Sequence, residues 1–176
     1  SLEALLAAGG VQLREVTLPP EDAVTQAHAL TVLAEARESY ADWTPNAELF
    51  PPTARRALTV AQGISRSQIA SARSALAAIS AAFAATGAEV DAIITPTLPV
   101  EPPAVGLNRI ELHGRSEPIV SVLVAQTCLA NVTGTPALSM PIPHTRVSIQ
   151  LLGRRHGDAD LFAAAHALRD AIGDQV

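Results

Sequence analysis

The sequence predicts an α/β chain in which helices flank part of a mixed central β-sheet. Two observations carry this prediction. Long alanine-rich segments place apolar residues at helical spacing, and short apolar runs that stop at proline or glycine stand between them. Because the two kinds of segment alternate along the chain, a layered α/β architecture is favoured over a helical bundle.

The first half of the chain reads mainly as helices that end at glycine or proline. The predicted helices are Leu2–Ala8, Glu21–Tyr40, Ala54–Val60 and a long helix from the N-cap Ser65 to about Thr86, ended by Gly87. Alternating residues from Val11 to Val16 predict a strand closed by Pro19-Pro20, and Trp43–Pro52 reads as irregular. A chain that opens with the tail of a helix suggests an excised piece.

The second half mixes short strands with helices. The predicted strands are Asp91–Thr95, stopped by Pro96, Ala137–Met140 and Val147–Leu152. We expect helices at Ile119–Ala130 and, capped by Asp158, from Ala159 to about Ile172. The proline- and glycine-punctuated stretch from Leu98 to Pro118 reads mostly as loop.

Size and charge limit the possible partners. The 176 residues match one domain, and 48% of them are hydrophobic, which suffices for a core built from Ala, Leu, Val and Ile. The net charge of −5 is spread along the chain, which argues against a nucleic-acid partner. Apolar runs such as Ala81–Ala85 fall far short of the ~20 residues of a membrane span. We expect a single domain over residues 1–176 with neither partner.

Two residue types constrain the chemistry. All 12 basic residues are arginine, so the chain cannot use lysine in catalysis, a Schiff base or a phosphate loop. The single cysteine, Cys128, excludes an internal disulfide and a multi-cysteine metal site, and its apolar neighbours predict a buried structural thiol. Because the first residues lack the pattern of a signal peptide, we expect a reducing, cytoplasmic setting.

Other candidate motifs give no complete active site. His156, Asp158 and Asp160 could bind a metal, but acidic residues at a helix start are common, and we favour that interpretation. Arg154-Arg155 could bind an anion, although a solvated strand end is more usual. The sequence contains no Gly-x-Ser-x-Gly elbow and no glycine-rich phosphate loop. We therefore expect no catalytic residue, no metal and no cofactor in this chain.

The five histidines lack metal spacing and stand at positions 28, 113, 144, 156 and 166. His113 and His144 fall in predicted loops, where catalytic groups often lie.

A set of ordered motifs from Gly63 to Leu161 resembles the amidase-signature family. Asp91–Pro99 resembles the family's strand and Thr-Pro-Thr turn. Thr127–Pro141 matches its pattern of Thr, three residues, Asn, two residues, Gly-x-Pro-Ala and a strand ending in Pro. Ser148–Gly153 and the helix after it resemble the closing strand and last helix. The resemblance covers nearly the whole chain, yet only the second half of the family's domain.

Enzymes of this family hydrolyse carboxamides with a Ser nucleophile, a second Ser on a cis peptide and a Lys base. All three lie in the first half of the domain, around a Gly- and Ser-rich signature that is missing here. The resemblance therefore implies the C-terminal part of an amidase that forms carboxylate and ammonia through an acyl-serine, inactive on its own. The alternative is a non-catalytic scaffold or interaction domain that reuses this half-fold.

Four residues are candidates for the wall of the substrate pocket: Thr127, Asn131, Gly134 and Pro136. A turn between helix and strand explains them equally well. The Asn131 amide can bond to backbone, Gly134 can take positive φ, and Pro136 can start a strand. Loops at strand ends also line α/β sites, so both interpretations stay open.

Two departures from the family pattern affect these expectations. The segment between Pro141 and Ser148 is shorter than the family's usual Gly-Leu-Pro-Val loop. Val124 stands where tRNA-dependent amidotransferases carry an acidic residue, which disfavours glutamine as amide donor. A truncated sheet also exposes an edge strand, so we expect a homo-oligomer formed through that edge.

Overall fold

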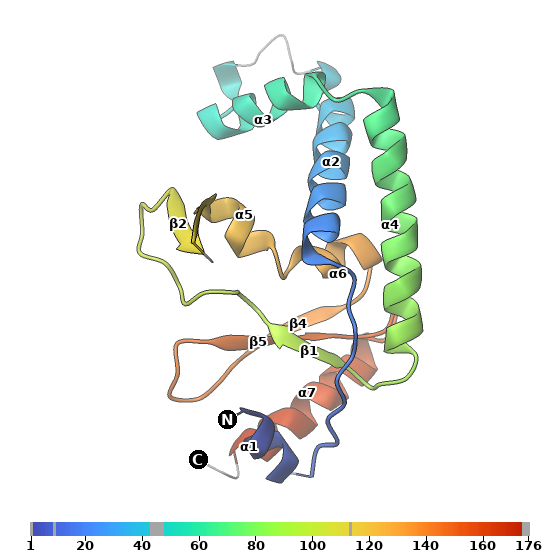
Figure 1. Cartoon of the computed structure of the whole chain (residues 1–176), viewed down its shortest axis with the longest axis vertical. Helices are drawn as coiled ribbons and strands as arrows, with labels where there is room; N and C mark the ends of the chain where they lie inside the picture. Colours follow the sequence, from blue (N-terminus) through green and yellow to red (C-terminus); the bar gives the residue numbers. More distant parts are fainter. Residues whose placement is uncertain (1, 9, 43–47, 113, 174–176) are drawn as a thin grey trace.

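The structure is a computed structural model that describes residues 2–8, 10–42, 48–112 and 114–173. Helices and strands alternate as expected (Figure 1). In chain order the elements are α1 (Leu2–Ala8), α2 (Glu21–Ser39), α3 (Pro52–Gln62), α4 (Arg66–Gly87), β1 (Ile93–Pro96), β2 (Arg109–Leu112), β3 (Arg115–Pro118), α5 (Ile119–Val124), α6 (Cys128–Thr133), β4 (Ala137–Pro141), β5 (Ser148–Leu152) and α7 (Asp158–Gly173).

The main sheet has three strands in the order β1-β5-β4, and both pairings are antiparallel. The register places Thr95 opposite Gln150 and Gln150 opposite Ser139. A separate two-stranded hairpin is formed by β2 and β3. The predicted α/β class, with a sheet flanked by helices, is confirmed.

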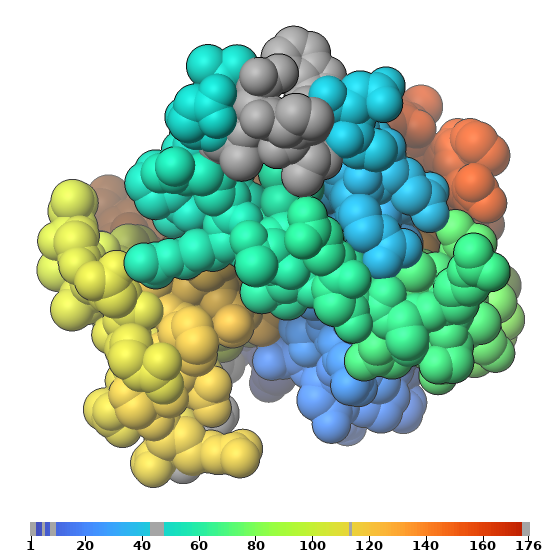
Figure 2. Space-filling model, turned by 90° about the horizontal axis from the view of Figure 1, so that it is seen from above, coloured from blue at the N-terminus to red at the C-terminus, as the bar shows by residue number. Residues whose placement is uncertain are grey.

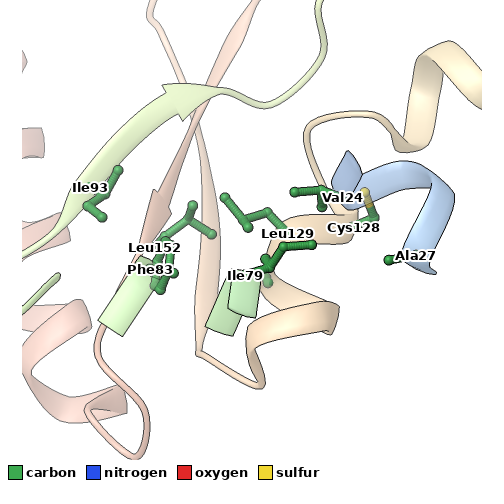
Figure 3. Packing of buried hydrophobic residues seen from close by; sticks show 9 residues of the cluster. Val24, Ala27, Ile79, Phe83, Ile93, Cys128, Leu129 and Leu152 are labelled. Carbon is green, nitrogen blue, oxygen red and sulfur yellow. The ribbon is translucent and has the colours of Figure 1, made fainter. Parts of the chain in front are cut away.

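Strand β5 lies between two apolar clusters. Its Ile149 and Leu151 pack with Leu6 of α1 and with α7, whereas Leu152 packs with residues of α2, α4 and α6. Figure 3 shows the second cluster, where Leu152 and Ile93 of the sheet meet Phe83 of α4. The core is thus aliphatic apart from Phe83, as the composition predicts.

The long helix α4 starts with a capping box. The Ser65 hydroxyl accepts a hydrogen bond from the Gln68 backbone N–H, and the Gln68 side chain accepts one from the Ser65 N–H. By length and composition alone, α4 could cross a membrane, a property that its short uninterrupted apolar runs do not reveal. In the structure, its buried residues Ile79 and Phe83 belong to the cluster shared with α2 and α6.

The predicted strand at residues 11–16 is wrong. Residues 11–20 are extended but have no strand partner in the described chain. They form a strap past β1: Val11 packs with the α7 cluster, and Leu18 packs with the opposite cluster. Thr86 Oγ1 donates to the Thr17 carbonyl at 3.3 Å. A segment that crosses from one face of the sheet to the other cannot keep the side-by-side register that a ladder needs.

Two other expectations in the second half need correction. The predicted loop from Leu98 to Pro118 contains the β2–β3 hairpin, whose turn uses Gly114 at φ 74°. The single helix predicted at Ile119–Ala130 is interrupted at residues 125–127. Ile119–Val124 is rich in β-branched residues, which lower helix propensity and favour a short helix.

The short connection between β4 and β5 is a closed hairpin turn. The Ile142 N–H donates to the Val147 carbonyl at 3.2 Å, and Thr145 Oγ1 donates to the Ile142 carbonyl at 2.8 Å. His144 takes the left-handed conformation, with φ 59°. The connection therefore needs no further residues to join the two strands.

The capping box gives a stability prediction. Replacing Ser65→Ala removes the acceptor for the Gln68 N–H, and should lower the free energy of unfolding by about 1 kcal/mol. Ser74→Ala, at an exposed position of the same helix, should be neutral or slightly stabilising. Urea unfolding followed by circular dichroism measures both. Equal losses in the two variants would contradict the capping role.

Burial also sets the titration of Cys128. Its side chain is 1% exposed, and this desolvation raises the pKa of the thiol above its ordinary 9.0. Above about pH 9 the thiol ionises in the unfolded chain before it does so in the folded one, so this contribution to stability is lost as pH rises. Urea unfolding of the natural chain should therefore weaken from about pH 8 to pH 10 more steeply than that of Cys128→Ala. Parallel pH profiles would show that the thiol does not contribute.

Candidate functional site

A cleft of about 190 Å³ opens where the end of β1, the start of α2 and the junction between α5 and α6 meet. Its floor is apolar and its rim carries a carboxylate, an amide and a hydroxyl. The lining residues are Leu18, Pro19, Glu21, Val24, Thr95, Ala125, Gln126 and Leu129.

A row of polar side chains crosses the sheet and ends at this cleft. The register aligns Thr95, Gln150 and Ser139 on neighbouring strands. Gln150 is only 4% exposed, and its Nε2 donates to Thr95 Oγ1 at 3.3 Å and to the Gln126 carbonyl at 3.2 Å. The hydroxyls of Thr97 and Ser139 lie 3.0 Å apart. Polar groups thus replace the apolar contacts that cover the other end of this sheet face.

A second bond ties the α5–α6 junction to α2. Gln126 Nε2 donates to Glu21 Oε2 at 2.5 Å, which joins residues far apart in the sequence. Glu21 is the first residue of α2, where the positive end of the helix dipole favours a carboxylate. The rim of the cleft is therefore held from two directions.

This arrangement can bind and orient a polar ligand. An amide, a carboxylate and a hydroxyl together offer donors and acceptors above a buried floor that includes Val24 and Leu129. Hydrolysis also needs a nucleophile activated by a base. In the described part of the chain, neither Thr97 nor Ser139 contacts a histidine or a carboxylate, and the sequence holds no lysine.

The four candidate wall residues do not converge on this cleft. Thr127 adjoins Gln126 at the junction, and Asn131 is exposed on α6. Gly134 ends α6 at φ 64°, and the Pro136 carbonyl accepts a bond from the Gly153 N–H at 2.9 Å. Pro136 and the start of β4 line a separate pocket of about 170 Å³ beside Leu161 and Phe162 of α7. Their shared role in a pocket wall stays a prediction.

The turn after α6 is built differently from the expected one. Its side-chain bonds come from Thr133, whose buried hydroxyl donates to the Leu129 carbonyl at 2.8 Å and meets Thr135 Oγ1 at 2.8 Å. The Asn131 amide takes no part in a described hydrogen bond. Gly134 and Pro136 occupy the turn and strand-entry positions that the sequence predicts.

The acidic cluster near the last helix matches a helix start. Asp158 is the first residue of α7, Asp160 lies in its first turn, and Arg154 is 3.9 Å from Asp160. His156 precedes them at φ 62°. Among the described residues no three His, Cys, Asp or Glu side chains are grouped to hold a metal ion.

The other histidines are dispersed. His28 is half-buried in α2, His144 lies in the β4–β5 turn and His166 is exposed on α7, while His113 falls outside the described residues.

Sequence reasoning missed the residues that build the polar row. Gln150 stands between Ile149 and Leu151 in a fully buried strand, and a lone amide in such a run is the signal that could have drawn attention to it. Thr95 follows Ile93-Ile94 in the same way. Glu21 was noted only as a favourable residue for a helix start.

Comparison with known proteins identifies the family. The sequence profile of the Amidase family matches residues 1–162. A fatty acid amide hydrolase of Oryza sativa subsp. indica is 25% identical over 97% of this chain and 29% of its own length. Another fatty acid amide hydrolase, from Medicago truncatula, is 23% identical over 99% of this chain and 30% of its own length. A glutamyl-tRNA(Gln) amidotransferase from Cenarchaeum symbiosum is 36% identical over 47% of this chain and 17% of its own length.

Solved structures agree in fold. A crystal structure of an amidase superposes with a TM-score of 0.85 at 24% identity, over 97% of this chain and 40% of the amidase. A vestigial protein complex linked to the origins of an s-triazine catabolic enzyme gives a TM-score of 0.84 at 18% identity, over 96% and 38%. The chain thus spans less than half the length of the proteins it matches. With a profile match over most of its residues, this chain belongs to the amidase family.

Proposed function

We propose that this chain supplies one wall of the substrate site in an enzyme that hydrolyses a carboxamide to carboxylate and ammonia through an acyl-serine intermediate. The observation that carries the proposal is the polar row that ends in a cleft at the end of β1. Thr95, Gln126 and Glu21 present a hydroxyl, an amide and a carboxylate there. Membership of the amidase family supports the reaction class.

The catalytic Ser–Ser–Lys set lies outside residues 1–176 in this proposal. The chain has no lysine to act as the base, and it spans 29% of the fatty acid amide hydrolase and 40% of the amidase structure. A hydroxyl without a positioned base is a poor nucleophile at neutral pH. Residues 1–176, taken as one domain, are then inactive alone and contribute binding and orientation.

The substrate in this proposal is not glutamine. Val124, at the end of α5, is 38% exposed, and Val120 one turn before it is 68% exposed. An apolar surface at this position would leave the charged groups of glutamine unpaired. Thr127 follows directly and completes the wall at the junction, with Asn131, Gly134 and Pro136 in outer positions.

A free strand edge supports self-association. The Gly153 N–H bonds to the Pro136 carbonyl and the Ile142 N–H to the Val147 carbonyl, so the alternation of an antiparallel ladder turns the N–H groups of Ala137 and Ser139 away from β5. In the described chain no strand pairs with them, whereas the strap lies beside β1. We propose a homo-oligomer through β4 in the cytoplasm, with no nucleic-acid or membrane partner.

The same edge favours a second candidate function, a non-catalytic interaction domain. An unpaired edge strand is a ready template for another chain. One solved structure of similar fold belongs to a vestigial protein complex, which supports this alternative. A lysine and a Gly-Ser-rich segment in frame upstream of Ser1 in the gene would favour the hydrolase instead.

The inactivity of the isolated chain can be tested directly. Purified chain incubated with propionamide or benzamide should release no ammonia above the buffer blank, because no base activates its hydroxyls. Ser139→Ala serves as the matched control for contaminating amidases. Turnover that is present in the natural chain and lost in Ser139→Ala would contradict the proposal.

Edge pairing predicts a mass that depends on one backbone N–H. Light scattering should show a dimer or larger assembly, and Ala137→Pro, which removes an outward N–H without a β5 ladder bond, should shift it toward monomer. Ala137→Val keeps the N–H and should behave as the natural chain does. A monodisperse monomer of the natural chain would count against the assembly.

A further inference from the structure

The segment between β1 and the α5–α6 junction, residues 97–125, forms an arm that carries β2, β3 and α5. These three elements contact mainly one another. Figure 1 shows them to one side of α2 and the sheet, and in Figure 2 the yellow and orange arm projects from the molecule beside a notch. Val105 and Leu107 are exposed on it, as are Val120 and Val124. The direction of this apolar surface depends on how the two ends of the arm are held.

Both ends of the arm are bonded to one buried side chain. Thr95, just before the arm, accepts a hydrogen bond from Gln150 Nε2 at 3.3 Å. The carbonyl of Gln126, just after it, accepts one from the same nitrogen at 3.2 Å. The bonds join Gln150 to residues 55 and 24 positions away. A single amide group on the central strand thus fixes the distance between the two ends.

Packing alone does not require an amide here. The neighbours of Gln150 in β5 are apolar and buried, and Leu152 on the same face belongs to an aliphatic cluster. Placing an amide in such a strand costs desolvation, which its two hydrogen bonds offset. The remaining described tie at the junction, from Gln126 to Glu21, lies at the exposed surface and constrains it less.

We propose that Gln150 is a positioning residue that sets the orientation of the arm and hence of the surface formed by Val120 and Val124. It acts through Thr95 and the Gln126 carbonyl and does not itself contact substrate. The link to substrate selection rests on the proposed function, in which the arm is a pocket wall. The mechanical claim, that one amide holds both ends of the arm, stands without it.

Hydrogen exchange in the full chain tests the mechanical claim. Gln150→Met keeps an unbranched side chain of similar length but removes both donated bonds. Exchange should accelerate about tenfold or more at the backbone N–H groups of Thr97 and Thr127, which bond to Ser148 and Val124 at the two ends of the arm. The N–H groups of Gly153 and Leu161, in the sheet edge and α7, should change by less than about twofold.

A merely structural role would give a different pattern. Equal acceleration at all four N–H groups would mean that Gln150 only adds to global stability, and no acceleration at Thr97 and Thr127 would mean that it does not hold the arm. Either result overturns the proposal. Because the readout involves no catalysis, its failure is separate from a failure of the proposed reaction.

A second variant keeps the test decisive if Gln150→Met does not fold. Thr95→Val removes one acceptor and preserves the shape of the side chain, so exchange should accelerate at Thr97 and not at Thr127. Gln126→Met serves as the control, since it removes the Glu21 tie and leaves the backbone carbonyl bonded to Gln150. Loosening of both ends by Gln126→Met alone, with none from Thr95→Val, would overturn the proposal.

Discussion

The position of β5 between two apolar clusters is the constraint on which the rest of the structure depends. A strand covered on both faces must be apolar throughout, and Ile149, Leu151 and Leu152 meet this requirement. They unite two layers of helices that otherwise share few contacts, α1 with α7 and α2 with α4 and α6. Gln150 is the exception within this strand. Its amide is retained in a place where a hydrocarbon would pack, because two distant segments bond to it.

Local signals predicted much of the fold. Ser65, Gly87 and Pro96 mark ends of elements through capping and loss of backbone donors, which are properties of a few neighbouring residues. The residues between Val11 and Leu18 misled the prediction, since their alternation is that of a strand. Whether such a segment pairs depends on where it must cross, and that is decided by the placement of α1 and α2. Tertiary context overrides the local pattern in such cases.

The site was less predictable because its geometry is assembled from distant segments. Motif matching selected Asn131 and Gly134, which stand together in sequence at one turn. Gly134 has the backbone conformation expected of it, but Thr133 makes the side-chain bonds of the turn. Glu21 and Gln126 come together only through folding, and no spacing in the sequence links them. Composition, by contrast, excluded lysine chemistry without any structure.

The strap formed by residues 11–20 has a consequence for how far this protein can associate. It lies beside β1, so in the described chain one rim of the sheet is shielded while the rim at β4 is open. Pairing between two β4 strands would use the same patch on each copy and would be closed after one step by a twofold axis. A sheet with both rims open could instead add copies without limit. The strap therefore separates a finite pair from a growing fibre.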